Sequence, residues 1–344
     1  MKIAIITQDK PCFPRVISEG LRDALINNNC KVELIHAIPF LMRSLPLKKK
    51  PIRWHANFNY RLRQKIKYIF HDYFLVKKLQ NFDIIIVAES YANLFWENYL
   101  YIEILRKKTN AKIISYSDSP LNAAPINKLR WLKSSDFDES RFDANLFLTN
   151  TVEVYYPNKA NQFTIGVNLS YLYKQELFNK NNILAVLDFP QNGYESDRLL
   201  QIQVLNELGI QTLELKENYS REDILKIYQS ATFFFLSSPE TFGLSIAECL
   251  SFGTLIFTPS SSWPMAWRLN KNPKSNEDGF LPSMCFKVYG DEANLKNILN
   301  NLIIEYDFNN SPQNVIKCFR ENYTNYFEGD RNQFEAFLNF VKTK

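Results

Sequence analysis

Short apolar runs with polar ends, separated by segments of helical periodicity, constrain this chain more than any other feature. A helical pattern runs from Arg15 to Asn28, between the first two runs. Strands that lack polar alternation are buried on both faces, and in alternation with helices they predict a doubly wound parallel sheet. The runs of the first half are KIAIIT (2–7), KVELIHAI (31–38), FDIIIVAES (82–90), AKIISYSD (111–118) and ANLFLTN (144–150).

A second series of the same kind begins near residue 181. Ser220 and Asp223 have the spacing of a capping box, and Gly209 and Gly253 stand where helices should end. This series predicts another α/β unit with a sheet of its own. Its apolar runs are NNILAVLDF (181–189), QTLEL (211–215), TFFFLSS (232–238) and TLIFTP (254–259).

The length of 344 residues is sufficient for two domains, and the 46% of apolar residues excludes a disordered or fibrous chain. Polar residues interrupt the pattern between Thr151 and Asn181. We therefore expect a first domain over 1–165, a connection over 166–180 and a second domain over 181–322. We also expect a last helix within 323–344, which could return to the first domain and pack on it.

Several protein classes are excluded by what the chain lacks. No apolar run is long enough to cross a bilayer, and the start MKIAIITQDK is too short and polar for a signal peptide. The five cysteines show no CxxC spacing, and the three histidines have no metal-ligand spacing. We expect a cytoplasmic protein with no disulfide framework, no metal site and no cofactor.

Glu240 and Glu248 lie on either side of a Phe-Gly-Leu turn in PETFGLSIAECLSFGTLIF (239–257). The turn follows an apolar strand, and a helix should start near Leu244 or Ser245 and end before Gly253. Amides at the start of a helix suit phosphate oxygens. A glycine in the turn lets the backbone come close to a ligand, and a carboxylate accepts two hydrogen bonds from a vicinal diol. A phosphate flanked by diols describes a nucleoside diphosphate sugar.

The same residues resemble the E-x7-E element of GT-B glycosyltransferases, in particular those of retaining glycosyltransferase family 4. QFTIGVNLSYLY (162–173) is similar to the connection between the two domains of these enzymes. The resemblance implies an α/β GT-B fold, with two doubly wound Rossmann-like domains that face a central cleft. It also implies that the first domain binds the acceptor and the second binds the donor, a nucleotide diphosphate sugar.

Carried over residue by residue, the resemblance implies that Glu240 contacts the donor sugar and takes part in catalysis. Phe242, Gly243 and Leu244 would contact the diphosphate and the sugar, and Glu248 would hold the ribose. Retention of the anomeric configuration is likewise implied by the resemblance.

The chain departs from the family pattern where the diphosphate should be neutralised. The usual basic residues after the first strand of the second domain are missing, and Arg198 is the nearest candidate. The Gly-Gly loop of the first domain is also missing, and Lys10 and Arg15 stand near that position. Asp118, at the end of a strand, could act as base toward the acceptor hydroxyl or could cap the next turn.

Two other features require an interpretation. DFD (136–138) matches the DxD motif of metal-dependent transferases, but it follows polar residues and is read as a solvated loop. The segment 43–78 carries eleven Lys or Arg residues and one acid, Asp72. It predicts either a helix with a solvated basic face or a surface that meets anionic lipid headgroups. Nucleic acid is not expected as a partner, since no recognition module accompanies the charge.

Together with these patterns, the resemblance implies a metal-independent glycosyltransferase that acts on a saccharide or a lipid-linked saccharide, in the synthesis of cell-surface polysaccharide or glycolipid. It would be cytoplasmic and able to associate with the inner face of the membrane. Two alternatives stay open. One is a sugar-nucleotide epimerase of the same fold, and the other is a non-catalytic GT-B subunit that binds a partner transferase.

Overall fold

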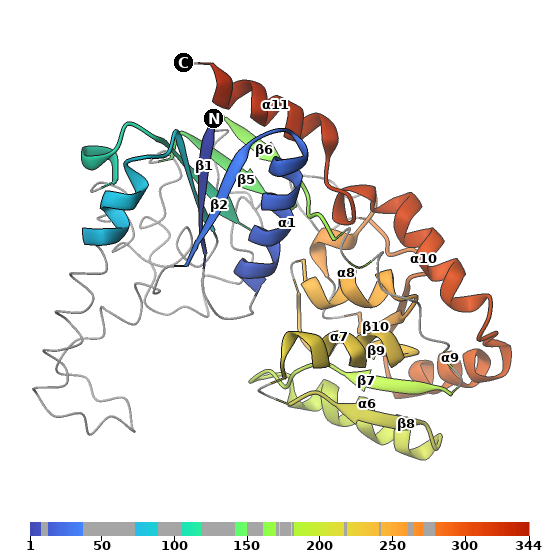
Figure 1. Ribbon diagram of the computed structural model, residues 1–344. Coiled ribbons are helices and arrows are strands. Elements are labelled where there is room, and N and C mark those ends of the chain that lie inside the picture. Colours follow the sequence, from blue (N-terminus) through green and yellow to red (C-terminus); the bar gives the residue numbers. More distant parts are fainter. Residues whose placement is uncertain are drawn as a thin grey trace, which may run out of the picture. The chain divides into compact units, whose positions relative to one another are not determined.

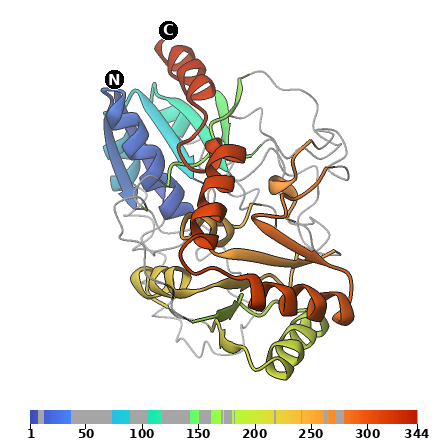
Figure 2. The same ribbon diagram turned by 90° about the vertical axis from the view of Figure 1, so that its right-hand side faces the viewer.

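The computed structural model (Figures 1 and 2) divides the chain into two compact units. Among the described residues, the chain passes from one unit to the other at Leu148–Thr149, Ile165–Gly166 and Asp330–Arg331. Each unit contains one parallel sheet flanked by helices. The structure describes residues 1–7, 13–36, 73–88, 105–117, 142–149, 161–169, 172, 180, 182–216, 219–240, 242–260, 264–270 and 279–343.

The first unit is built on a six-stranded parallel sheet of order β2-β1-β3-β4-β5-β6. The central strand β3 has the sequence IIIVA and every residue of it is buried, as a strand covered on both faces should be. Figure 1 shows α1 along one face of the sheet. The elements are β1 (Lys2–Thr7), α1 (Phe13–Asn27), β2 (Lys31–His36), β3 (Ile84–Ala88), β4 (Lys112–Ser117), β5 (Ala144–Phe147) and β6 (Gln162–Thr164).

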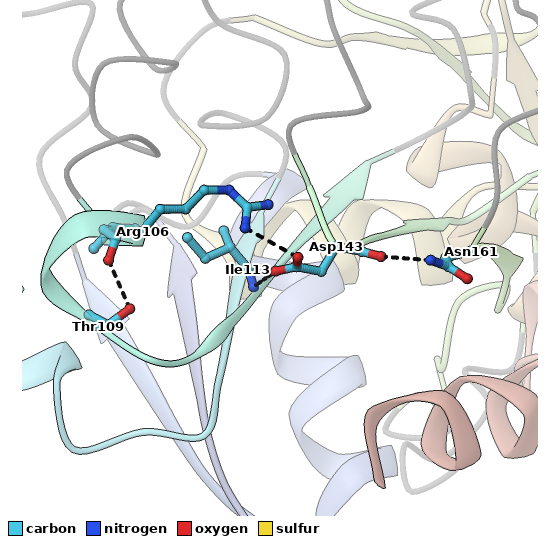
Figure 3. Close-up of polar contacts among 6 residues, drawn as sticks. Arg106, Thr109, Ile113, Asp143 and Asn161 are labelled. Atoms are coloured by element: carbon cyan, nitrogen blue, oxygen red, sulfur yellow. Dashed lines mark hydrogen bonds and ion pairs between the residues drawn. The ribbon is translucent and has the colours of Figure 1, made fainter. Parts of the chain in front are cut away.

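Asp143, which directly precedes β5, links the amino-terminal ends of neighbouring strands of this sheet (Figure 3). One carboxylate oxygen accepts the backbone N–H of Ile113 at 2.6 Å and the other lies 3.2 Å from the Arg106 guanidinium. The carbonyl of Asp143 accepts the side-chain amide of Asn161 at 3.1 Å, just before β6. A single acid therefore links the starts of β4, β5 and β6.

The C-terminal helix α11 (Arg331–Lys342) belongs to the first unit and packs on β6. The rings of Phe337 and Phe163 meet edge to face at 5.8 Å. The Lys112 ammonium donates to the carbonyls of Phe340 and Thr343 at 2.9 and 2.6 Å, which satisfies acceptors that the end of a helix leaves open.

The second unit is built on a five-stranded parallel sheet of order β11-β10-β9-β7-β8. Its three inner strands are mostly apolar, and β9 consists of three buried phenylalanines, whereas the edge strand β8 has the sequence QTLE and is exposed or half-buried. Helices α7 and α8 contact each other, as do α6 and α9, and Figure 1 shows the two pairs on opposite faces of the sheet. The strands are β7 (Leu184–Leu187), β8 (Gln211–Glu214), β9 (Phe233–Phe235), β10 (Leu255–Pro259) and β11 (Phe286–Tyr289).

The helices of the second unit begin and end for local reasons. The Ser220 hydroxyl accepts the backbone N–H of Asp223 at 3.1 Å and so caps α7, as the sequence predicts. Gly253 follows α8 with φ of +71°, and a Cβ there would lie 2.6 Å from Pro312, so the glycine also allows α10 to approach. The helices are α6 (Glu195–Glu207), α7 (Arg221–Ser230), α8 (Leu244–Ser251), α9 (Glu292–Glu305) and α10 (Ser311–Asn322), with 3-10 turns η5 (Met265–Trp267) and η6 (Thr324–Tyr326).

The prediction of two α/β units with parallel sheets is confirmed. β6 and β11 are strands that the sequence analysis did not predict. β6 has three residues, all of them half-buried, so it lacks the buried apolar run that marks inner strands such as β3 and β9. Among the described residues no helix combines the length and the apolar character needed to cross a membrane.

Candidate functional site

Buried polar side chains gather in the second unit around the carboxyl ends of its strands. Asp188 directly follows β7, Ser237 and Ser238 follow β9, and all three are buried. The Gln201 amide donates to the Leu236 carbonyl at 2.8 Å, also just beyond β9. Ligands of parallel sheets bind outside the carboxyl ends of the strands, so this edge is the candidate site.

The turn before α8 is shaped for a close approach of its backbone. Gly243 is the N-cap of the helix, with φ of +64°, and a Cβ there would lie 2.9 Å from a methyl carbon of Ile246. Helix α8 starts at Leu244 and ends at Ser251, as predicted. The amides of Gly243, Leu244 and Ser245 donate to no other described residue. They therefore form a group of donors at the positive end of the helix dipole.

Trp267 orients the first of these amides. Its indole N–H donates to the Phe242 carbonyl, and its ring stacks on the Phe242 ring at 5.7 Å. The peptide group that joins Phe242 to Gly243 is planar and trans, so its C=O and N–H point in opposite directions. With the carbonyl held by the indole, the Gly243 N–H is directed away from Trp267.

Two tyrosines hold the Trp267 segment in turn. The hydroxyl of Tyr326 donates to the Ala266 carbonyl at 2.7 Å, and that of Tyr323 donates to the Trp267 carbonyl at 2.5 Å. The Met265 N–H donates to the Glu240 carbonyl at 3.2 Å. The sequence analysis missed this support. The only signal was the density of aromatic residues in WPMAW (263–267) and NYTNYF (322–327).

Glu248 lies one turn inside α8 and is 1% exposed. Both of its carboxylate oxygens face the guanidinium of Arg221, the first residue of α7, in a two-pronged ion pair with Nη1 and Oε2 3.0 Å apart. The Arg221 side chain is 27% exposed. The sequence analysis placed Glu248 in the site and missed Arg221, which lies 27 residues earlier. The pair keeps a charged carboxylate inside the unit.

Arg198 points its guanidinium at the ends of two neighbouring strands. Nη1 donates to the carbonyl of Asp188, and Nη2 lies 3.2 Å from the carboxylate of Glu214 at the end of β8. The side chain is thus at the predicted edge of the sheet, held by protein acceptors. Its role as a phosphate ligand stays a prediction.

Asp188 is buried beside Arg198, and its carboxylate accepts the N–H of Phe189 at 2.8 Å. Burial raises the pKa of Asp188 to about 6, and the Phe189 hydrogen bond and the Arg198 charge only partly oppose this. The acid therefore changes its charge close to neutral pH. The sequence analysis did not consider this residue.

The other predicted site residues have different surroundings. The side chain of Glu240 is half-buried in the turn before α8. Arg15, in the first unit, forms an ion pair with Glu19 one turn later in α1, at 2.9 Å. Lys10 and Asp118 lie outside the described residues, as do DFD (136–138) and most of the basic segment 43–78. Of the basic segment, 73–78 is described, and Tyr73 and Phe74 there are exposed.

Among the described residues, no three His, Cys, Asp or Glu side chains cluster in a way that could hold a metal ion. The expectation of no metal site stays a prediction.

Solved structures share this arrangement of two α/β units along their whole length. An α-glucosyltransferase in complex with UDP-glucose and DNA containing an abasic site matches all of this chain and 99% of its own, with a TM-score of 0.60 and 13% identity. The fold is that of the GT-B glycosyltransferases. The catalytic domain of starch synthase IV from Arabidopsis thaliana, bound to ADP and acarbose, matches 99% of both chains, with a TM-score of 0.54 and 12% identity.

An epimerase has the same GT-B architecture. The UDP-GlcNAc 2-epimerase of Neisseria meningitidis, bound to UDP-GlcNAc, matches all of both chains with a TM-score of 0.55 and 12% identity. Neither the protein-family models nor the curated protein sequences give a match to this chain. At these identities the structural likeness concerns the fold alone.

Proposed function

We propose that this protein is a glycosyltransferase that moves a sugar from a nucleoside diphosphate sugar to a saccharide or lipid-linked saccharide acceptor. The observation that carries the proposal is the group of amides at Gly243, Leu244 and Ser245, which donate to no other described residue and are flanked by Glu240 and Glu248. It stands on a fold whose solved examples include enzymes that hold UDP-glucose and ADP. Donors at a helix start bind phosphate, and the flanking carboxylates accept hydroxyls on either side of it.

In this proposal the amides around Gly243 bind the diphosphate and stabilise the charge that develops on it as the sugar departs. Glu248 accepts the hydroxyls of the ribose and Glu240 those of the transferred sugar. Asp118 assists the acceptor hydroxyl, and Lys10, Arg15 and Arg198 add positive charge. Retention of the anomeric configuration and independence from metal ions belong to the same proposal.

The proposal is tested by titrating UDP-, GDP- and ADP-sugars against the wild type and Glu248→Ala. Binding should fall by about a hundredfold or more in the variant, because hydrogen bonds to a charged acceptor are among the strongest. Glu305→Ala, which removes an exposed acid from α9, is the matched control and should bind as the wild type does. Failure of the wild type to bind any of the three donors would contradict the proposal.

Product analysis then identifies the reaction. Mass spectrometry of mixtures with free oligosaccharides, with lipid-linked saccharides in anionic vesicles and with DNA distinguishes the acceptors, and EDTA should leave transfer unchanged. NMR of the product gives its anomeric configuration.

Co-sedimentation with the same vesicles tests the proposal that segment 43–78 brings the protein to the inner face of the membrane. Binding that withstands charge reversal at Lys48, Lys49 and Lys50 would contradict that part.

Two alternatives from the sequence analysis lead to different outcomes. An epimerase of the same fold would isomerise the donor, which would appear as a change in the sugar without any acceptor. The engagement of Arg198 and Arg221 with protein acceptors favours a non-catalytic subunit, which would bind no nucleotide sugar.

A further inference from the structure

Two cysteines of the second unit, Cys285 and Cys318, have their sulfur atoms 2.8 Å apart. Cys285 directly precedes β11, and Cys318 lies in α10, 33 residues later in the sequence. Both are free thiols and both are buried. A disulfide forms only between side chains that already face each other at close range, and folding has brought these two thiols into such an arrangement.

The pair lies beside the aromatic residues that support the candidate site. Each of the two cysteines is followed by a phenylalanine whose ring packs against Trp267, Phe286 at 5.7 Å and Phe319 at 5.9 Å. Trp267 in turn donates its indole N–H to the Phe242 carbonyl. A bond between the two sulfur atoms would therefore join two of the segments that surround Trp267.

The two thiols differ in reactivity. The Cys285 S–H donates to the Cys318 sulfur, and this hydrogen bond lowers the pKa of Cys318 and raises the pKa of Cys285. Cys318 is also 9% exposed, whereas Cys285 is completely buried. Because the thiolate is the reactive form of cysteine, Cys318 is the thiol that meets an oxidant first. Cys285 is then placed to react with the oxidised Cys318.

Packing alone does not account for two thiols in contact. Cysteine packs as a small apolar side chain, and its S–H is only a weak donor. Cys249 in α8 illustrates this packing role, because burial raises the pKa of its thiol well above the ordinary value and keeps the thiol unreactive. The pair differs from Cys249 in having a second sulfur within reach.

We propose that Cys285 and Cys318 are a modification site, at which a peroxide forms a reversible disulfide that joins the segments around Trp267. The Cys318 thiolate attacks one oxygen of hydrogen peroxide, and the O–O bond breaks. Cys318 becomes a sulfenic acid, and the hydroxide that leaves takes up a proton to give water.

The second step closes the bond. The Cys285 sulfur attacks the Cys318 sulfur, and the sulfenic hydroxyl leaves with the Cys285 proton as a second water. Two thiols have then lost two electrons to one peroxide, which is reduced to two waters. A dithiol reverses the change by thiol–disulfide exchange. This chemistry does not depend on which ligand the second unit binds.

The experiment treats the full chain, reduced beforehand with dithiothreitol, with hydrogen peroxide and then removes the excess with catalase. Free thiols are alkylated in denaturant, and the peptides are identified by mass spectrometry. We expect a cross-linked peptide that joins Cys285 to Cys318, while Cys30 and Cys249 are alkylated. Dithiothreitol added after the peroxide should make both members of the pair available for alkylation again.

Thermal unfolding measures the effect of the bond on the fold. The oxidised chain should melt about 5 to 10 °C above the reduced chain, because the bond restricts the unfolded state. Cys285→Ser should abolish this rise and leave Cys318 as a sulfenic acid, which dimedone traps. Cys30→Ser, in the first unit, is the matched control and should keep both the cross-link and the rise.

Cys318→Ala serves if Cys285→Ser does not fold, and should likewise abolish the cross-link and the rise. Alkylation of both cysteines after peroxide treatment of the wild type would overturn the proposal. Cys318 found as a sulfinic or sulfonic acid without a cross-link would do the same, as would a cross-link to Cys30 or Cys249 in place of the expected one. A Cys285–Cys318 cross-link without a higher melting temperature would show that the bond does not stabilise these segments, which also contradicts the proposal.

Discussion

The two units have the same kind of sheet, but among the described residues only the second unit buries charged side chains as well as neutral polar ones. Among the described residues the first unit buries Thr7, Ser18, Ser115, Ser117 and Asn145, which are all neutral. The second unit buries the charged groups Lys180, Asp188, Arg198 and Glu248. The described parts of the two units thus differ in how much buried charge they carry.

The buried charges of the second unit have two different places in the fold. The Lys180 ammonium donates to the Ala231 carbonyl and, at 2.9 Å, to the Thr254 hydroxyl, which precede β9 and β10. Burial lowers the pKa of Lys180 to about 7. Asp188 and Arg198 lie at the opposite, carboxyl edge of the sheet. The comparison shows two uses of buried charge. Lys180, at the amino edge of the sheet, hydrogen-bonds the loops that precede two strands, whereas Asp188 and Arg198, at the carboxyl edge, lie beside the candidate site.

The largest effect should come from breaking one buried pair. Arg221→Met leaves the Glu248 carboxylate buried without its main counter-charge, and we expect the free energy of unfolding to fall by about 3 to 5 kcal/mol. The double variant Arg221→Met with Glu248→Met removes both charges and should return to within about 1 kcal/mol of the wild type. Urea denaturation measures both. A double variant as unstable as the single one would show that the pair itself stabilises the fold.

The first unit provides the matching neutral case. The Ser115 hydroxyl donates to the side-chain oxygen of Asn145 between β4 and β5, and both residues are buried. Ser115→Ala should lower the free energy of unfolding by about 1 kcal/mol in urea denaturation, because one neutral hydrogen bond is lost. A decrease as large as that expected for Arg221→Met would remove the contrast between the two units.

A pH dependence of intermediate size should come from Asp188. Its pKa is about 6 in the folded protein and 3.8 as the ordinary value, so the folded state retains a proton that the unfolded state has released. The contribution to stability is therefore present below about pH 4 and lost as the pH rises to about 6, by about 2 to 3 kcal/mol.

Asp188→Asn keeps an oxygen that can accept the Phe189 N–H and removes the titration. The stability of this variant relative to the wild type should increase between pH 4 and pH 7 by the same amount, in urea denaturation at each pH. A difference that stays constant across this range would mean that Asp188 does not titrate there.

A small effect on stability should come from the support of the Gly243 amide. Trp267→Phe keeps a ring in the aromatic cluster but removes the N–H that holds the Phe242 carbonyl. We expect stability to fall by about 1 kcal/mol and donor affinity to fall by about tenfold, because the amide is no longer fixed.

Tyr323→Phe is the matched control for Trp267→Phe. It also removes one buried hydrogen bond, from the hydroxyl to the Trp267 carbonyl, but leaves the indole in contact with Phe242. It should lose similar stability and keep its donor affinity. Equal losses of affinity in the two variants would contradict a specific role for the indole N–H.

Features that depend on short stretches of chain were predicted well. The apolar runs became β1, β3, β4 and β7, and the start of α8 at Leu244 and the Ser220 cap of α7 lie where the pattern placed them. Each of these follows from backbone preferences and burial within a few residues. β6 and β11 were missed because their short runs carry little periodicity of their own.

The partners of the site residues were not predicted. Glu248 was placed in the site from its spacing, but nothing near it in the sequence indicated a guanidinium from α7. The indole that orients the Gly243 amide likewise comes from a segment 25 residues after Phe242. These contacts exist only because the parallel sheet brings successive helices and loops to the same edge.

The sequence by itself determined that the chain forms two α/β units and that a glycine turn with two acids opens a helix of the second. Only the tertiary structure decided which of those acids is buried, which arginine it faces and which way the turn directs its amide. The physical reason is how far apart in the sequence the interacting residues lie. Strand, helix and cap depend on neighbouring residues, whereas the charge and orientation of a site depend on side chains that folding brings from distant positions.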